Sequence, residues 1–307
     1  MSDVRQKYAL VTAACNEEAY IERTIQSVVA QTLLPQRWTI VSDCSMDRTD
    51  EIVQSYTDCH PFIQLVQVRE KHARNFAAQV HAINLACSRL QDCDYQFIGN
   101  LDADVSFEPN YFIQLLAKFD EDPLLGLAGG FICEEQGGQF KSRQTNSVRS
   151  VAHAIQMFRR ECFESIGGYT ALKYGGPDWH GEVMARMHGW RVEAFPQLRV
   201  FHHRPTGSAD RLIRYRFWEG LTDHSFGTSP WFELVRLARR IPSKPFALGT
   251  LSRFAGFCWG YCSGKNREVS EEFVTFVRNE EKERLRSFFH EVFRSSTKSK
   301  LFSVGQG

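Results

Sequence analysis

Hydrophobic and polar positions alternate in a regular way over the first hundred residues. Short apolar runs are typical of buried strands, and the segments between them repeat apolar residues at helical spacing. Strands that alternate with helices predict βαβ units, so we expect an α/β fold with a doubly wound, mostly parallel sheet. The predicted strands are 8–14, 38–41, 62–68 and 95–99, and the predicted helices are 18–31, 47–56 and 73–90.

The pattern changes after residue 120. An apolar, glycine-punctuated run at 124–133 precedes a polar stretch at 136–146 that we expect to be a loop. We expect a catalytic-type domain at 1–229, a helical C-terminal extension at 230–294 and a disordered tail at 295–307 that is rich in Ser, Lys and Gly. Further strands are predicted at 152–158, 191–195 and 199–201, and further helices at 161–166 and 178–188.

Composition excludes several classes of protein. The chain has 307 residues and a formal net charge of +1, so it has no global basic field to hold nucleic acid. Its nine cysteines are scattered without a CxxC pair, which favours a reduced, cytoplasmic location over a zinc ribbon. No run of eighteen uncharged apolar residues is present, so we expect no membrane-spanning helix.

Two carboxylates, Asp102 and Asp104, follow the fourth predicted strand directly. Continued extension would place both on one side of the chain, where they repel each other unless a cation neutralises them. Mg²⁺ or Mn²⁺ with bound phosphate oxygens meets that need, and such a metal would draw charge from a diphosphate leaving group. The alternative is a polar loop with a helix cap.

A third acid, Asp43, follows the second predicted strand. A carboxylate there can accept the ring N–H of a base such as uracil. Asp47, a few residues on, is expected to cap the next helix instead of touching a ligand.

Three spaced motifs together resemble the inverting GT-A fold glycosyltransferases of family 2, which include many bacterial polysaccharide-building enzymes. The motifs are Ala-Ala-Cys-Asn-Glu-Glu at 13–18, Ser-Asp-Cys-Ser-Met-Asp-Arg-Thr at 42–49 and Asn-Leu-Asp-Ala-Asp at 100–104. The resemblance implies a hexosyltransferase-like enzyme with a nucleoside-diphosphate sugar donor, UDP-sugar favoured, and a sugar or lipid-linked acceptor. It implies nucleotide contacts from Ala14, Asn16, Glu17, Asp43 and Asp102, and a metal bond from Asp104.

The same resemblance implies a catalytic base at Asp178. Members carry an acidic pair at the opening of a late helix, and the matching stretch here is Gly-Pro-Asp-Trp at 176–179, with Pro177 in place of the first acid. An inverting transfer needs a base to take the acceptor proton. Asp178 would otherwise cap its helix, and Glu182 is the second candidate for the base.

Two basic clusters offer ligands for the metal or the diphosphate. A neutral imidazole of His202 or His203 would complete the metal shell, and Arg204 would hold phosphate, although a buried structural histidine explains the pair equally well. Lys71 and Arg74 open a predicted helix whose free N–H groups suit a diphosphate; the alternative is a solvated first turn.

The segment 230–261 combines basic and aromatic residues at helical spacing. Such a helix lies in an anionic membrane interface, which would make the protein peripheral on the inner face of the cell membrane, or packs against the catalytic domain. Both interpretations stay open. The basic residues are Arg236, Arg239, Arg240, Lys244 and Arg253, and the aromatic ones include Trp231, Phe254, Phe257 and Trp259.

Other enzyme classes lack their motifs in this chain. A nucleotidyltransferase needs a Gly-rich basic loop, which residues 13–18 do not supply, and neither a G-x-G-x-x-G nor a P-loop motif is present. A non-catalytic protein that binds nucleotide sugars or acts as a scaffold remains the alternative from another class.

Overall fold

The computed structural model describes residues 6–70, 76–204, 209–240, 246–264 and 267–303. The chain divides into two compact units, Met1–Thr206 and Gly207–Gly307. This division falls earlier than the boundary after residue 229 that the sequence suggested, because a helix at Ala209–Ser225 associates with the helices that follow it.

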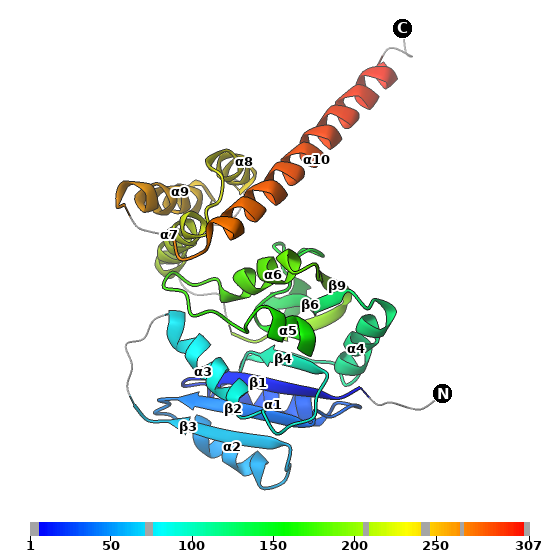
Figure 1. The fold of residues 1–307 in the computed structure, drawn as a ribbon, viewed down its shortest axis with the longest axis vertical. Coiled ribbons are helices and arrows are strands. Elements are labelled where there is room, and N and C mark those ends of the chain that lie inside the picture. Colours follow the sequence, from blue (N-terminus) through cyan, green and yellow to red (C-terminus); the bar gives the residue numbers. More distant parts are fainter. Residues whose placement is uncertain (1–5, 71–75, 205–208, 241–245, 265–266, 304–307) are drawn as a thin grey trace. The chain divides into compact units, whose positions relative to one another are not determined.

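A nine-stranded sheet forms the centre of the first unit (Figure 1). Its order is β3-β2-β1-β4-β8-β6-β9-β5, with β7 paired to β6. The strands β3, β2, β1 and β4 run parallel, as do β6 and β9, whereas β8 and β5 are antiparallel to their neighbours. The strands are β1 Tyr8–Ala14, β2 Arg37–Asp43, β3 Ile63–Val68, β4 Phe97–Leu101, β5 Val105–Phe107, β6 Leu125–Gln136, β7 Gln139–Ser142, β8 Ile155–Arg159 and β9 Arg191–His202.

Helices cover both faces of this sheet, and each face has its own apolar core. One core holds side chains from α1, α2 and α4, and the other holds side chains from α3, α5 and α6. Strand β1 contributes to both, because Tyr8 and Leu10 face the first core and Ala9 and Val11 the second. The helices are α1 Ile21–Val29, α2 Thr49–Thr57, α3 Phe76–Ser88, α4 Tyr111–Glu121, α5 Arg160–Ser165 and α6 Pro177–Met187.

The α/β fold and the four predicted N-terminal strands are confirmed, but the polar stretch 136–146 is not a plain loop. Residues of β6 and β7 pair as a hairpin, with Gln136 opposite Gln139. Gly137 and Gly138 between them have φ of 64° and 78°, the left-handed values that a two-residue hairpin turn requires. The low hydrophobicity that suggested a loop reflects the exposure of this hairpin.

The second unit consists of helices α7 Ala209–Ser225, α8 Pro230–Arg240, α9 Phe246–Cys262 and α10 Glu271–Ser303. Helix α10 continues through the start of the tail that the sequence predicted to be disordered, and ends at Ser303. Among the helices described, none is both long enough and apolar enough to cross a membrane.

Candidate functional site

Two loops at the carboxyl ends of β1 and β2 are joined by hydrogen bonds from side chains to backbone. The Asn16 side chain accepts from the backbone N–H of Met46 at 2.8 Å, and Ser45 Oγ accepts from the N–H of Asn16 at 3.1 Å. Asp47 accepts from the N–H groups of Glu18 and Thr49, both at 3.0 Å. Asp47 therefore stabilises the two loops and bonds the first residue of α2, although the N-cap position of that helix is Arg48.

The turn between β4 and β5 carries Asp102 and Asp104. It crosses from the middle of the sheet to its edge, because β4 pairs with β1 and β8 whereas β5 pairs only with β9. Thr24 Oγ1 from α1 donates to the carbonyls of Ala103 and Val105 at 2.9 and 2.8 Å. The chain thus turns after Leu101 and does not continue in the extended conformation that the sequence suggested.

Pairing of β5 with β9 brings the residues after β9 to this turn. Val105 lies opposite His202, and the N–H of His203 donates to the Asp104 carbonyl at 2.9 Å. His202 Nε2 lies 3.6 Å from Oδ2 of Asp104. Arg204 donates from Nε to the same oxygen at 2.7 Å, and its terminal nitrogen also bonds the carboxylate of Glu17.

Negative charge is in excess around this turn. Burial raises the pKa of Glu17 to about 7, with Arg204 opposing the rise and Asp104 adding to it. Burial also raises the pKa of Asp102; His153 opposes that shift, and the carboxylates of Asp104 and Asp178 add to it. These mutual effects place Glu17, Asp102 and Asp104 within electrostatic range of one another, and Asp178 within electrostatic range of Asp102.

The residues around Asp104 fit a divalent cation that also binds phosphate. Oδ1 of Asp104 is buried and accepts no hydrogen bond from the residues that the structure describes, while Oδ2 faces an imidazole nitrogen of His202. An oxygen and a neutral imidazole are ligands that Mn²⁺ accepts. Within the described part of the chain no three His, Cys, Asp or Glu residues form a complete metal cluster, so a cation here would take its other ligands from diphosphate oxygens and water.

Asp178 lies in the first turn of α6. The N-cap position of this helix is Gly176, so Asp178, two residues further on, is not the N-cap residue. Glu182 is used elsewhere. It is buried, and its Oε1 accepts from the N–H of Val151 at 2.8 Å and from Ser150 Oγ at 3.0 Å, which fixes the chain before β8.

The other residues that the sequence predicted for the site are placed as follows. Ala14 is the buried last residue of β1, and Asp43 ends β2 half-buried. His203 points to the opposite side from His202, where its Nε2 lies 2.7 Å from Ser106 Oγ, so the structure separates the two histidines. Lys71 and Arg74 lie outside the described residues.

One residue near the acids was missed from the sequence. His153 Nε2 lies 4.0 Å from Asp102 Oδ1, and the carbonyl of His153 accepts from the Asn100 side chain at 2.8 Å. The ring of Tyr169 stands edge-on to His153, and its hydroxyl donates to Gln156 at 2.7 Å. His153 carries no motif, and only the antiparallel pairing of β8 with β4 brings it to Asp102.

A surface hollow lies elsewhere in the first unit. Its volume is about 360 Å³, and its lining includes Phe97 at the start of β4 together with Arg159 and Arg160. Arg159 donates to the backbone carbonyls of Leu125 and Phe119, so it stabilises the fold there. The hollow is at the opposite end of β4 from the acids, and the chemistry described above does not depend on it.

A family model described as glycosyl transferase family 2 matches residues 9–195, which is more than half of the chain and lies within the first unit. The chain belongs to glycosyl transferase family 2. A relative of this family 2 chain is described as "Putative teichuronic acid biosynthesis glycosyltransferase TuaG" of Bacillus subtilis (strain 168). The two are 33% identical over 104 residues, which is 34% of this chain and only 38% of the relative's length.

Solved structures resemble the family 2 chain over most of its length. The mannosyltransferase PcManGT from Pyrobaculum calidifontis, in complex with GDP-Man and Mn²⁺, is 18% identical with a TM-score of 0.57, covering 89% of this chain and 83% of that chain. TarS of S. aureus in complex with UDP-GlcNAc is 14% identical with a TM-score of 0.53, covering 89% and 78%. These similarities confirm the GT-A fold that the sequence motifs implied for the family 2 chain.

Proposed function

We propose that this family 2 protein transfers a sugar from a nucleoside-diphosphate sugar to an acceptor hydroxyl with inversion at the anomeric carbon. The observation that carries the proposal is the convergence of Glu17, Asp104 and Arg204, with Asp102 and Asp178 within electrostatic range. Excess buried negative charge next to one arginine is suited to binding a divalent cation together with a diphosphate. The carboxylate of Asp178, in the first turn of α6, is available as a base.

The donor nucleotide would lie on the loops that follow β1 and β2. Asn16, Ser45 and Asp47 hold these loops together, so the carboxylate of Asp43 and the backbone near Ala14 keep a fixed spacing. Asp43 would accept the imide N–H of the base. PcManGT was solved with GDP-Man and TarS with UDP-GlcNAc, so relatives of this fold bind either nucleotide; we retain a UDP-sugar as the donor.

Asp104 and His202 would hold the divalent cation. When bound, the cation neutralises the charge that develops on the diphosphate as the sugar leaves. Arg204, which now bonds Asp104 and Glu17, would donate to a diphosphate oxygen in the loaded site. Asp102 would bind the ribose hydroxyls or assist at the cation. PcManGT was solved with Mn²⁺, which supports a divalent cation in this fold.

Asp178 would take the proton of the acceptor hydroxyl as its oxygen attacks the anomeric carbon. The bond from that carbon to the diphosphate oxygen breaks, and the nucleoside diphosphate leaves with the electron pair. The product is a glycoside of inverted configuration. The TuaG relative is described as a putative glycosyltransferase of teichuronic acid biosynthesis, so we take the acceptor to be a growing polysaccharide or a lipid-linked precursor of one.

A panel of UDP- and GDP-sugars, assayed for thermal shift and donor hydrolysis with Mn²⁺, Mg²⁺ or chelator, tests the proposal. We expect one sugar nucleotide to raise the melting temperature and to be hydrolysed only with the cation. Binding without hydrolysis or transfer to any acceptor would instead favour the non-catalytic nucleotide-sugar-binding protein. No binding at all would refute both.

A further inference from the structure

Helix α9 of the second unit turns an apolar face to solvent. Leu248, Leu251 and Trp259 expose 64%, 62% and 53% of their surface. With the exposed Ala255 and Cys262 they follow one another at steps of three and four residues, which places all five on one side of the helix. This apolar stripe is about 21 Å long, at a rise of about 1.5 Å per residue.

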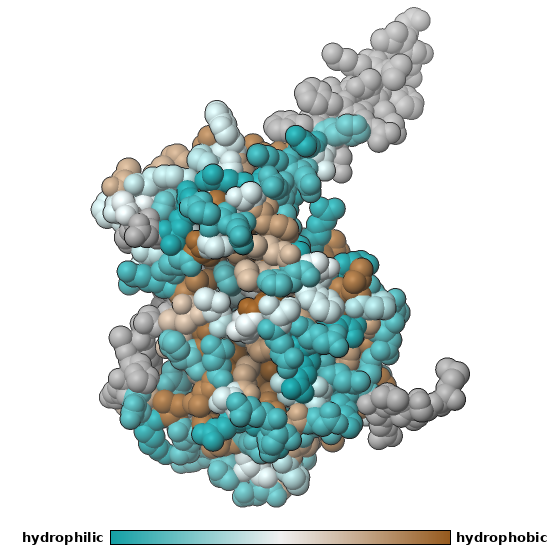
Figure 2. Space-filling model, viewed as in Figure 1, coloured by the Kyte–Doolittle hydropathy of each residue, from teal (hydrophilic) through white to brown (hydrophobic). Residues whose placement is uncertain are grey.

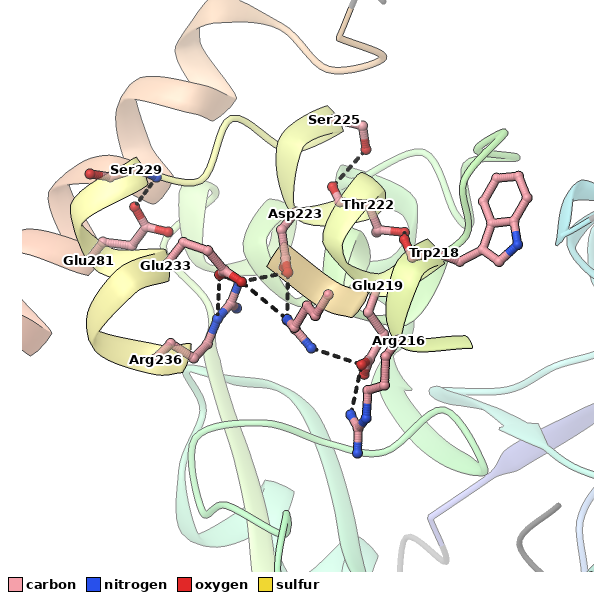
Figure 3. A network of polar contacts seen from close by, with 11 residues as sticks. Arg216, Trp218, Glu219, Thr222, Asp223, Ser225, Ser229, Glu233, Arg236 and Glu281 are labelled. Carbon is pink, nitrogen blue, oxygen red and sulfur yellow. Dashed lines mark hydrogen bonds and ion pairs between the residues drawn. The ribbon is translucent and has the colours of Figure 1, made fainter. Parts of the chain in front are cut away.

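The only charged residue of α9 points the other way. Arg253 is 5% exposed and bonds Glu219 and Asp223 of α7 at 2.9 and 2.6 Å. Figure 3 shows the network in which these acids lie, with Glu233 and Arg236 of α8 joined to it. The one charged side chain of α9 is therefore neutralised on the side that packs against α7, while apolar side chains of α9 face solvent, the reverse of an ordinary surface helix.

Close packing fixes α9 in this orientation. A Cβ on Gly256 would stand 2.0 Å from the Phe217 carbonyl oxygen, and one on Gly220 would stand 1.9 Å from that of Arg253. The backbones of α7 and α9 thus touch where only glycine fits. Rotation of α9 to bury its apolar stripe would break both this contact and the Arg253 ion pairs.

Helix α8 adds to the exposed apolar surface. Trp231 is 75% exposed, and Leu234 also faces solvent. In Figure 2, brown apolar surface is visible over the helices of the second unit. The membrane interpretation of 230–261 was wrong for three of its residues. Phe257 is buried, and Arg236 and Arg253 form internal ion pairs, so these side chains do not face a membrane.

Charge in the sequence around α9 has a single sign. Residues 234–267 contain seven basic residues and no acidic one. Two of the seven, Arg236 and Arg253, form the internal pairs. The other five stand on both sides of the apolar stripe in sequence: Arg239, Arg240 and Lys244 before it, Lys265 and Arg267 after it.

We propose that the second unit docks on an anionic lipid surface through the outward face of α9. The apolar stripe enters the interface, and Arg239 and Arg267, which stand before and after it in sequence, contact acidic headgroups. A second copy of the chain is a poorer match, because both ends of the stripe are basic and self-pairing in either direction sets like charges opposite each other. This inference does not depend on the transfer activity.

Co-sedimentation of the full chain with vesicles tests the proposal. We expect binding to phosphatidylcholine vesicles that contain phosphatidylglycerol, weak binding to phosphatidylcholine alone, and release by high salt. The variant Leu248→Ser/Leu251→Ser/Trp259→Ser should lose binding at least about tenfold, and Arg239→Glu/Arg267→Glu should do the same. Helical circular dichroism should stay unchanged in both, since Leu248, Leu251 and Trp259 are exposed, Arg239 is exposed with its guanidinium over the Phe288 ring, and Arg267 is half-buried outside the helices.

Matched controls come from the first unit. Leu124→Ser removes another exposed apolar side chain, and Lys141→Glu reverses another exposed charge; neither should alter vesicle binding. A parent protein that stays in the supernatant with every vesicle overturns the proposal. An α9 variant that binds vesicles as well as the parent also overturns it. The same holds if the parent does not bind vesicles but forms a dimer that the α9 substitutions dissociate.

Discussion

Arg204 donates a hydrogen bond from Nε to Oδ2 of Asp104 at 2.7 Å, although the two residues stand 100 positions apart in sequence. The bond joins the turn after β4 to the end of β9 and, through the second nitrogen of Arg204, to Glu17 after β1. Without substrate, this guanidinium compensates the buried acids. Once the donor binds, the divalent cation would neutralise these carboxylates in place of Arg204, and the guanidinium would bond the diphosphate.

Replacing Asp104 with Ala should abolish metal-dependent turnover and leave the fold intact. The change removes a carboxylate at the turn and no volume from the sheet core. Titration of UDP with and without Mn²⁺ should show that the nucleotide affinity of the variant no longer depends on the metal. Ser106→Ala, which frees His203 on the opposite side, is the control and should keep the metal dependence. Full activity of the Asp104 variant would refute the metal site.

Replacing Asp43 with Ala should weaken nucleotide binding more than it slows chemistry. Loss of one charged hydrogen bond to the base costs about 1.5–3 kcal/mol. Isothermal titration with UDP and with uridine measures the loss, which should be similar for both because the contact is to the base. Glu51→Ala on the exposed side of α2 serves as the control. Equal UDP affinity of parent and Asp43 variant would rule this role out.

Replacing Asp178 with Asn should keep donor binding and lower transfer by about 10²–10⁴-fold, since the amide cannot accept the acceptor proton. Asp178 is not the N-cap residue of α6 and asparagine has nearly the same size, so the melting temperature of the protein should change little. The comparison of donor affinity with transfer rate separates a base from a binding residue. Near-normal transfer by this variant would remove Asp178 from the chemistry.

Glu182 should make stability depend on pH. Burial raises its pKa to about 8 in the folded protein, from an ordinary value of 4.5, while Arg186 opposes the rise. The folded state therefore holds a proton that the unfolded state has released, so this contribution is complete below pH 4.5 and is lost as pH rises toward 8. The loss is on the order of a few kcal/mol.

Glu182→Gln should remove this part of the slope, because glutamine still accepts from Val151 and never ionises. Denaturant unfolding between pH 5 and 8 measures the free energy of unfolding of parent and variant. The contributions of the other titrating groups are the same in both proteins and cancel in the difference. Glu161→Gln on the exposed side of α5 should leave the slope as it is. Parallel curves for parent and Glu182→Gln would contradict the prediction.

Several features of this protein follow from its sequence alone. The strand β1 was located to the residue, because a run of apolar residues is a local property that any buried strand shares. The loops after β1 and β2 and the turn with Asp102 and Asp104 were located as polar breaks at strand ends. Short elements were not predicted. The three-residue strand β5 is an example, because so short a segment has no periodic pattern of apolar residues.

Only the tertiary structure decided which of these groups meet and which charges face inward. Strand β5 crosses to the sheet edge, and its pairing with β9 sets Arg204 on Asp104, turns His202 toward it and turns His203 away. In the second unit, Arg253 looked like a membrane-facing cation at helical spacing but is buried in ion pairs. A local pattern fixes the period of a helix or strand, whereas the face that packs is chosen by contacts with segments far away in sequence, such as the glycine contact between α7 and α9.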